Sequence, residues 1–472
     1  MRTLFDPAAP PQNASVLDSE ALVLYFLGPK TVTGEDVLEF HVHGGPATVK
    51  SVLSAIPRAL AHPGAASPSK RVRYAEPGEF TKRAFINDRL DLAQIESLSD
   101  TLAAETEQQR RAAVRGNSGA LGRTYDGWRE QLLQARGEIE ALIDFSEDQH
   151  FDEPQSELLA SVTAQVDDML RGIRLHEQGS QRSELLRNGI RIALLGPPNV
   201  GKSSLMNLIV GREASIVSGE AGTTRDIVEA SLDIRGYLCS FADTAGFRSK
   251  ASLAKNGGLN AGPIGLVEEE GIRRAKQKAQ DSDIVVVLAS VEKGVDGHFI
   301  YYDEETLDLA AQAQACMVVI NKVDAVDPSE FNVLLEQFRQ TTATKSAGLA
   351  TTEFVTISCS EAQANISRGS DPGGIQRLIN TLVGSFSKMT EMPVDMQDLL
   401  GVTERQRQLL VKCRMHLEDF IDEAQPGEGE DRDADTVLAA EYLRYAADCL
   451  ARITGRGEGG DVEDVLGVVF EK

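Results

Sequence analysis

The pattern of apolar residues predicts two β-strands near the N-terminus, at residues 21–27, which are continuously apolar, and at residues 37–42. In the second segment Leu38, Phe40 and Val42 alternate with polar neighbours, which is the period of a half-buried β-strand. Apolar residues then recur at helical spacing between residues 49 and 60, which predicts a helix. The pattern indicates a small α+β unit at the start of the chain.

Longer apolar stripes with helical periodicity lie on both sides of a central region. They run through residues 128–142 and 159–173 before that region and through residues 409–420 and 438–449 after it. Amphipathic helices bury such stripes against one another. We therefore expect the two helical blocks to pack together as one domain.

The central region alternates short β-rich runs with helical stretches. The runs lie at residues 190–195, 238–242, 284–288, 317–320 and 354–357. This alternation is typical of a parallel sheet covered by helices on both faces. We predict a multidomain protein with an N-terminal domain at 1–90, a helical domain built from 91–187 and 386–472, and an inserted α/β domain at 188–385.

The amino-acid composition and the net charge argue against several classes of protein. The 472 residues are 42% apolar and 25% charged, as in ordinary globular proteins, and they contain no run of about 18 apolar residues that would span a membrane. The 48 basic residues against 72 acidic ones give a net charge of −24, which argues against a general basic surface for nucleic acid. Five cysteines without a CxxC pair favour reduced thiols over a disulfide framework or a zinc site.

A phosphate-binding loop follows the predicted strand at residues 190–195. The segment from Gly196 to Ser203 fits the pattern G-x-x-x-x-G-K-[ST] and leads into an apolar-periodic helix, the context that this motif requires. Its glycines allow backbone N–H groups to surround a phosphate, Lys202 can reach the β- and γ-phosphates, and the Ser203 hydroxyl can ligate Mg²⁺.

Further segments arrive in the order that a guanine nucleotide requires. Thr224 offers a second hydroxyl for Mg²⁺, and Asp243, which follows a strand, supplies the carboxylate on the side of the metal. Asp324 can accept hydrogen bonds from the N1–H and N2–H₂ groups of guanine, a pair of donors that adenine lacks. The residues expected to contact GTP are Asn199, Val200, Gly201, Lys202, Ser203, Ser204, Ser218, Gly219, Glu220, Ala221, Gly222, Thr223, Thr224, Asp243, Thr244, Ala245, Gly246, Asn321, Lys322, Val323, Asp324, Ser358, Cys359 and Ser360.

Phe247 follows Gly246, at the place where many GTPases carry a glutamine that orients the attacking water. A phenyl ring cannot orient water. Water positioning and charge neutralisation must therefore come from a cation, a partner or a different side chain.

Motifs outside the nucleotide site are more specific. They are TGEDVLE at 33–39, HGG at 43–45, PGEFTKRAF at 77–85, NDRLDL at 87–92 and AGTTRD at 221–226. With these motifs the chain resembles the tRNA-modification GTPase family MnmE, also called TrmE, and in particular its mitochondrial form. The resemblance implies a folate-binding N-terminal domain, a helical domain and an inserted P-loop GTPase domain, in a protein that forms a homodimer.

The same resemblance implies a K⁺ ion in place of an arginine finger. By position Asn199, Ser218, Glu220 and Thr223 would surround it, and a cation beside the phosphates offsets charge that grows as the bond breaks. Glu268 matches the family's catalytic glutamate, so that Glu268, Lys202 and Asn199 form the expected catalytic set. From its sequence context alone, Glu268 reads as a solvated glutamate at a helix start.

In the N-terminal unit, the resemblance places Glu39 and Arg89 at the site of a reduced folate of the 5,10-methylenetetrahydrofolate type. A carboxylate suits the donors of a pterin ring. The residues alone leave an alternative open, a metal site formed by Glu39, His41 and His43 on one strand face.

The expected function is GTP hydrolysis in the modification of carbon 5 of the tRNA wobble uridine. The expected partner is an FAD-containing MnmG-type protein, and we expect no association with a membrane. The expected location is the mitochondrial matrix, with a bacterial-type cytoplasmic location as the alternative. Alternatives for function are a ribosome-assembly GTPase and a nucleotide-dependent scaffold with little hydrolysis.

The family's first strand and its C-terminal Phe-Cys-x-Gly-Lys motif are absent from this sequence, and we expect GTP hydrolysis not to depend on them. Cys449 lies on a helical stripe and is expected in the core.

Overall fold

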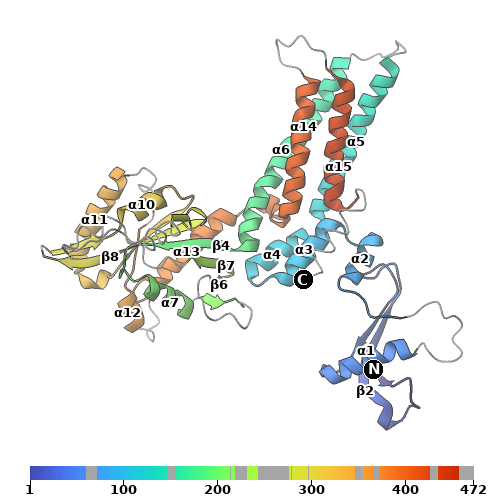
Figure 1. Cartoon of the computed structure of the whole chain (residues 1–472), viewed down its shortest axis with the longest axis horizontal. Coiled ribbons are helices and arrows are strands. Elements are labelled where there is room, and N and C mark those ends of the chain that lie inside the picture. The colour runs from blue at the N-terminus through green and yellow to red at the C-terminus, as the bar shows by residue number, and fades with distance from the viewer. Residues whose placement is uncertain are drawn as a thin grey trace, which may run out of the picture. The chain divides into compact units, whose positions relative to one another are not determined.

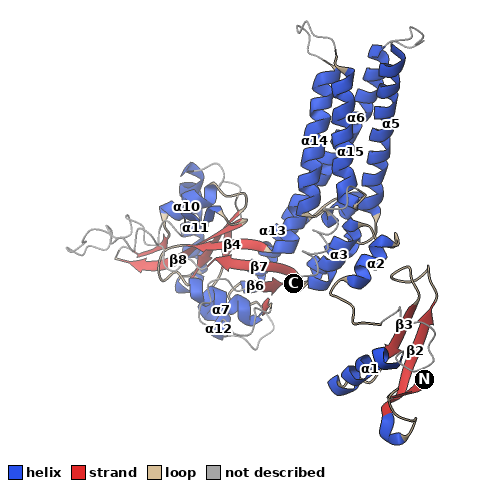
Figure 2. Ribbon diagram, turned by 45° about the vertical axis from the view of Figure 1, so that its right-hand side comes forward, coloured by secondary structure: helices blue, strands red, loops and turns tan. Residues whose placement is uncertain are grey.

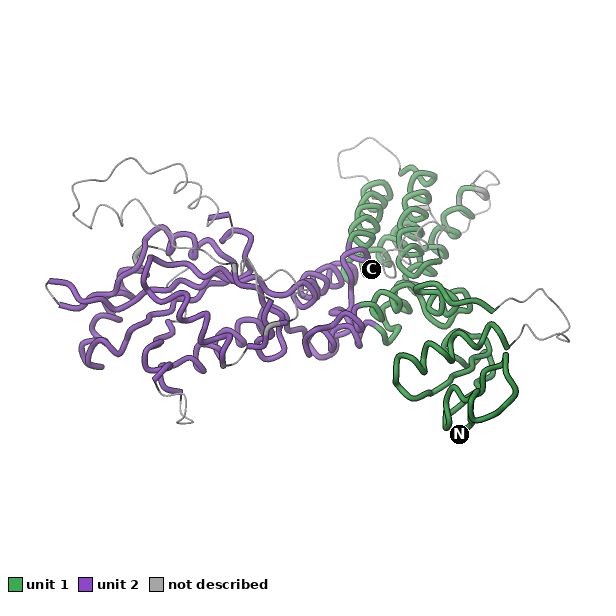
Figure 3. The backbone as a smooth tube through the Cα atoms, turned by 60° about the horizontal axis from the view of Figure 1, so that its bottom comes forward, with its two compact units in different colours: residues 1–99, 117–171, 408–472 green, residues 100–116, 172–407 purple. Residues whose placement is uncertain are grey.

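The computed structural model divides the chain into two compact units. Unit 1 comprises residues 1–99, 117–171 and 408–472, and unit 2 comprises residues 100–116 and 172–407 (Figure 3). The structure describes residues 1–59, 72–146, 155–212, 214–217, 231–242, 276–277, 279–295, 297–345, 352, 354–364, 371–425 and 434–456.

Unit 1 begins with a three-stranded antiparallel sheet in the order β1-β2-β3 (Arg2–Phe5, Val16–Phe26 and Val37–His41). Helix α1 (Pro46–Ala59) packs on β2 and buries Val52 and Ala55. The predicted strands and helix are present, and β2 begins earlier than the strand that the apolar run at residues 21–27 predicted. The N-terminal unit is α+β, as predicted.

The rest of unit 1 is helical. Figures 1 and 2 show the long helices α5 (Ala120–Ser146) and α15 (Thr436–Thr454) side by side with α6 (Gln155–Asn188) and α14 (Glu404–Ala424), and α5 and α15 pack along each other. The unit also holds α2 (Glu79–Ile86), most of α3 (Leu92–Ala103), the first half of α6 and most of α14.

Residues of the predicted stripes are buried in these helices. They are Leu132, Ala135 and Ile139 in α5, Leu159, Val162, Val166 and Leu170 in α6, Leu409, Leu410, Cys413, Leu417 and Phe420 in α14, and Cys449 in α15. At the end of α15, Thr454 donates a hydrogen bond of 3.0 Å to Asp126 of α5. Helices from before and after the central region therefore share one core, because each alone would expose its apolar stripe.

Unit 2 contains a twisted sheet in the order β11-β10-β8-β4-β7-β6-β5, with β9 paired to β8. The strands are β4 (Ile190–Leu195), β5 (Ala214–Ile216), β6 (Ser231–Ile234), β7 (Tyr237–Ala242), β8 (Ile284–Gly294), β9 (Gly297–Tyr301), β10 (Cys316–Asn321) and β11 (Phe354–Thr356). Helices α10 (Glu304–Ala311) and α11 (Pro328–Lys345) cover one face, and α7 (Lys202–Arg212) and α12 (Cys359–Ala364) cover the other (Figure 1).

The sheet is mixed, which corrects the prediction of a parallel sheet. Strands β11, β10, β8, β4 and β7 are parallel, whereas β5, β6 and β9 are antiparallel to their neighbours. The β6–β7 connection is a two-residue turn, in which Arg235 and Gly236 have φ of 50° and 90°. Such a turn joins antiparallel strands because its twist matches theirs.

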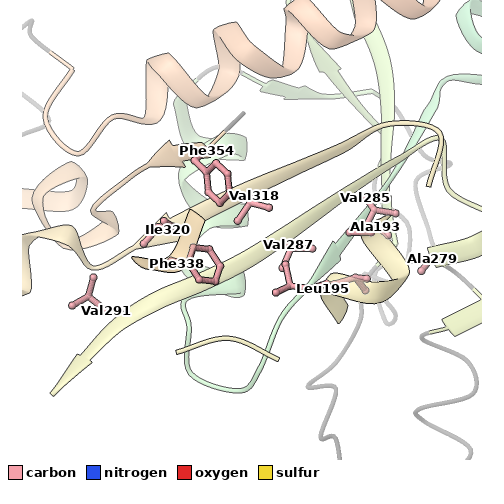
Figure 4. Close-up of a cluster of buried hydrophobic side chains, with 12 residues drawn as sticks. Ala193, Leu195, Ala279, Val285, Val287, Val291, Val318, Ile320, Phe338 and Phe354 are labelled. Atoms are coloured by element: carbon pink, nitrogen blue, oxygen red, sulfur yellow. The ribbon is translucent and has the colours of Figure 1, made fainter. Parts of the chain in front are cut away.

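The core of unit 2 lies between the sheet and helices α10 and α11. Figure 4 shows it, with side chains from β4, β8 and β10 together with Phe338 of α11 and Phe354 of β11. The two phenyl rings meet edge to face, with centroids 5.8 Å apart. Burial on both faces explains why β4, β8 and β10 read as continuous apolar runs in the sequence.

Helix α4 (Glu107–Gly116) belongs to unit 2, where it packs against β7 and against the 3₁₀ segment η4 (Val394–Gly401). The Gln108 amide donates to the Gly236 carbonyl at 3.0 Å, and this bond joins α4 to the β6–β7 turn. Arg187 near the end of α6 donates to the carbonyls of Gly401 and Val402 and pairs with Asp100 at 2.7 Å. Unit 2 also contains α13 (Ile375–Thr390) and the short η2 (Val323–Ala325). Among the described helices of both units, none is long and apolar enough to cross a membrane.

Candidate nucleotide-binding site

The phosphate loop lies between β4 and α7, in the strand-loop-helix context that the sequence predicted. Gly196 has φ of 146°, and a Cβ atom there would lie 2.3 Å from the Leu288 carbonyl oxygen of β8. Gly201 has φ of 103°, and a Cβ atom there would lie 2.3 Å from the Asn321 Nδ2 atom. Asn199 between them also adopts a positive φ, 65°. The two glycines thus allow the loop to approach β8 and Asn321 in a backbone conformation that residues with a Cβ atom rarely adopt, and such a backbone suits a cradle for phosphate.

Lys202 is the first residue of α7, at the positive end of the helix dipole. Its ammonium group donates to the carbonyls of Gly196 at 2.7 Å and Pro197 at 2.9 Å. These bonds hold the charge directly over the loop. Ser203 follows with an exposed side chain, so its hydroxyl is accessible to a hydrated metal ion.

Asn321 connects three segments that the sequence singled out separately. Its side chain is buried, with 2% of the residue exposed. The Nδ2 atom donates to the Val200 carbonyl of the phosphate loop at 2.8 Å, and Oδ1 accepts from the Cys359 amide at 3.1 Å. The phosphate loop, the end of β10 and the start of α12 therefore meet at one point.

The residues after Asn321 form the turn that leads from β10 into η2 (Val323–Ala325). Lys322 adopts a left-handed backbone conformation with φ of 62°, and its ammonium group lies 2.6 Å from the Glu292 carboxylate. Asp324 is exposed, with its carboxylate accessible to a ligand. Burial raises the pKa of the Cys359 thiol to about 11, and the negative charge of Asp324 adds to this effect. Cys359 is therefore a neutral thiol at pH 7.

The segment Ser358, Cys359 and Ser360 is held by a pair of glycines that the sequence reading missed. The Ser358 amide donates to the Gly373 carbonyl at 2.9 Å. A Cβ atom on Gly373 would lie 2.2 Å from the Ser358 carbonyl oxygen, and both Gly373 and Gly374 have positive φ. The Gly-Gly dipeptide between the last strand and α13 was the available signal. Glu292 was missed as well, because it lies on a strand whose extension to Gly294 the apolar run did not indicate.

Several predicted site residues lie outside the part of the chain that the structure describes. These are Ser218, Gly219, Glu220, Ala221, Gly222, Thr223, Thr224, Asp243, Thr244, Ala245, Gly246, Phe247 and Glu268. Their roles, including most of the K⁺ set and one Mg²⁺ ligand, stay predictions. The structure does describe Asn199, Val200 and Gly201 of the phosphate loop and Lys202, Ser203 and Ser204 in the first turn of α7.

In unit 1 the structure separates the residues of the alternative metal site. Glu39 pairs with His41 at 3.0 Å, whereas the His43 ring lies 2.9 Å from the buried carboxylate of Asp18. Backbone N–H groups of His43 and Glu20 lower the pKa of Asp18. Within the described residues, no three His, Cys, Asp or Glu side chains form a group that could hold a metal ion. The metal-site hypothesis is therefore wrong, because the strand ends at His41 and His43 turns to Asp18.

The expected folate residues lie in the same unit. Arg89 is exposed, and its Nε donates to the Thr31 carbonyl at 3.0 Å. Glu39 is partly buried on β3. One Arg89 nitrogen is used within the protein, and the remaining donors of its guanidinium group can meet a carboxylate.

Comparison with known proteins agrees with this arrangement. The family model described as the MnmE helical domain matches residues 92–472, and the GTP-binding protein TrmE N-terminus matches residues 1–89. A relative from Parvibaculum lavamentivorans, the tRNA modification GTPase MnmE, is 36% identical over 98% of this chain and 87% of its own length. The mitochondrial 5-taurinomethyluridine-[tRNA] synthase subunit GTPB3 of Danio rerio is 35% identical over 97% of this chain and 82% of its own.

A third relative comes from Saccharomyces cerevisiae. This protein, the mitochondrial tRNA modification GTPase MSS1, is 33% identical over 98% of this chain and 80% of its own length. Together the two family models account for nearly the whole sequence, from the N-terminal sheet to the last helices. The chain belongs to the MnmE family of tRNA modification GTPases.

Proposed function

We propose that this chain hydrolyses GTP as part of the modification of carbon 5 of the tRNA wobble uridine. The observation that carries the nucleotide assignment is the double hydrogen bond of Asn321, which joins the phosphate loop to the loops expected around the base. The tRNA assignment rests on family membership and on the names of the relatives.

The described residues suit the binding of a guanine nucleotide. Lys202 would exchange its bonds to the carbonyls of Gly196 and Pro197 for bonds to the β- and γ-phosphates, which lie over the same loop. The exposed carboxylate of Asp324 would accept hydrogen bonds from the guanine N1 and N2 donors. Mg²⁺ at Ser203 and Thr224, and K⁺ at Asn199, Ser218, Glu220 and Thr223, would supply positive charge beside the phosphates.

Water activation falls to Glu268 in this proposal, because Phe247 cannot orient water. We further propose a homodimer, a reduced folate held by Glu39 and Arg89, and an FAD-containing MnmG-type partner. Location in the mitochondrial matrix is supported by mitochondrial relatives, although bacterial relatives are equally similar.

The test is steady-state GTP hydrolysis in K⁺ and in Na⁺ at equal ionic strength. We expect turnover in K⁺ to exceed turnover in Na⁺ by at least about tenfold, because a correctly placed cation stabilises the transition state by a few kcal/mol. Glu268→Ala should reduce kcat in K⁺ by about 10²-fold or more, whereas the control Glu270→Ala, which changes a neighbouring glutamate, should not.

Each alternative outcome has a definite meaning. Equal rates in the two salts would contradict the K⁺ assignment. GTP binding without turnover in either salt would identify a nucleotide-dependent scaffold, a function with which Phe247 is compatible.

A further inference from the structure

The ion pair between Lys322 and Glu292 lies at the edge of the candidate base site. Lys322 stands between Asn321, which is fixed to the phosphate loop, and Asp324, which is expected to recognise guanine. The Lys322 Nζ atom lies 2.6 Å from Glu292 Oε1, and each side chain is about one third exposed, at 37% and 34%. Glu292 belongs to none of the sequence motifs.

Strand β8 carries Glu292 beyond the parallel part of the sheet. Ser290 is the last β8 residue paired with β10, and its partner is Asn321. From there β8 continues as an antiparallel hairpin with β9, in which Glu292 pairs with Phe299. The hairpin therefore places a carboxylate beside the loop that leaves β10.

The carboxylate of Glu292 is itself held in place. Ser290 and Glu292 lie on the same face of β8 because side chains alternate along a strand. The buried hydroxyl of Ser290 donates to Glu292 Oε1 at 2.8 Å, the same oxygen that contacts Lys322. Ser290, Glu292 and Lys322 thus form a connected chain of hydrogen bonds from the sheet to the base loop.

Lys322 needs such support. A residue with a Cβ atom is disfavoured at positive φ, at a cost of order 1–3 kcal/mol, and stays there only when its surroundings fix it. Its backbone φ of 62° turns the chain from β10 into η2, the turn that carries Asp324. The Ala325 amide donates to the Lys322 carbonyl at 3.1 Å, and the ion pair with Glu292 adds a side-chain anchor to this backbone bond. Loss of the anchor would loosen the turn and the position of the Asp324 carboxylate.

We propose that Glu292 is a positioning residue for guanine recognition, which acts through Lys322 to hold the turn that presents Asp324. This inference rests on the proposed GTP-binding function. A purely structural ion pair of this exposure would add little to stability and nothing to nucleotide affinity. A positioning role therefore predicts that loss of the Glu292 charge lowers nucleotide affinity, whereas a purely structural ion pair predicts no change in that affinity.

The experiment measures the affinity of the full-length protein for GDP and for inorganic pyrophosphate, by competition with a fluorescent GDP analogue. Glu292→Gln keeps the size of the side chain and removes its charge. We expect GDP affinity to fall by about three- to tenfold, in line with the loss of one charge-assisted hydrogen bond. Pyrophosphate affinity should stay within about twofold, because Glu292 contacts Ser290 and Lys322, which lie outside the phosphate loop.

Two further variants test the route of action. In the Lys322→Ala background, Glu292→Gln should change GDP affinity by less than about 1.5-fold, because the two residues act in one chain. The control is Glu305→Gln, which removes the carboxylate of another exposed Lys–Glu pair in unit 2, that with Lys276. It should leave GDP affinity unchanged.

The possible results distinguish a failure of the positioning role of Glu292 from a failure of the proposed GTP binding. If the wild type binds GDP tightly and Glu292→Gln binds it equally well, the positioning role is wrong and GTP binding stands. A fully additive effect in the Lys322→Ala background would also overturn the role. A wild type without affinity for GDP would overturn the proposed function together with this inference.

Discussion

At the scale of single residues, the candidate site depends on backbone conformations that few residue types adopt. Gly196, Gly201, Gly373 and Gly374 all have positive φ, and a side chain at any of them would collide with a neighbouring strand or loop. The sequence marks the first two through the phosphate-loop motif. At these four glycines we therefore expect a single added methyl group to disturb the site.

Gly201→Ala should damage the site, because its Cβ atom would meet the Asn321 amide at 2.3 Å with φ at 103°. We expect a loss of about 2–4 kcal/mol in stability and a fall in GDP affinity of more than about tenfold. Chemical denaturation and GDP titration measure the two effects.

The matched control is Gly211→Ala near the end of α7, where a Cβ atom meets nothing within 4 Å. It should stabilise the protein by up to about 1 kcal/mol, because helical glycine is entropically unfavourable. GDP affinity of Gly201→Ala equal to that of Gly211→Ala would contradict the cradle.

At the scale of elements, helix α6 shows how burial sets a response to pH. His176 lies on the part of α6 in unit 2, and burial lowers the pKa of its imidazole from 6.5 to about 4. Above pH 6.5 the ring is neutral in both the folded and the unfolded chain. Between pH 6.5 and 4 the unfolded chain binds the proton more readily, so stability falls as the pH falls.

We expect His176→Gln to lose less stability than the wild type between pH 7 and pH 4.5. The greatest contribution of this one ring is about 3 kcal/mol, from a shift of roughly two and a half pKa units. Thermal unfolding of both proteins across this range measures the difference. Parallel curves for the two proteins would show that His176 titrates normally.

At the scale of the whole molecule, the net charge of the chain determines its electrostatic attraction to RNA. The net charge of −24 opposes any general attraction to a phosphate backbone. We therefore expect any contact of this chain with tRNA to use a local surface rather than a general electrostatic attraction.

We expect the protein alone to show no saturable binding to a labelled poly(U) oligonucleotide at about 0.15 M salt. Fluorescence anisotropy over a range of salt concentrations measures this. Binding tighter than about 1 µM with a steep salt dependence would reveal a basic surface and would revive the ribosome-assembly alternative. A substrate tRNA is the comparison, for which any binding should depend only weakly on salt.

The sequence by itself determined the elements and the chemistry of contiguous motifs. Apolar periods predicted the helices of both helical blocks and the buried strands β4, β8 and β10. The phosphate loop could be identified because its glycines, Lys202 and Ser203 are neighbours in the chain, so their geometry follows from local backbone conformation.

Only the tertiary structure decided which distant residues meet. Asn321 reaches Val200 across 121 positions, and Glu292 reaches Lys322 only because β8 extends past β10 in a particular register. His43 turned to Asp18 rather than to Glu39, and β5, β6 and β9 proved antiparallel. Local sequence carries period and propensity, whereas these contacts depend on strand register and on turns, which are fixed when the whole sheet packs.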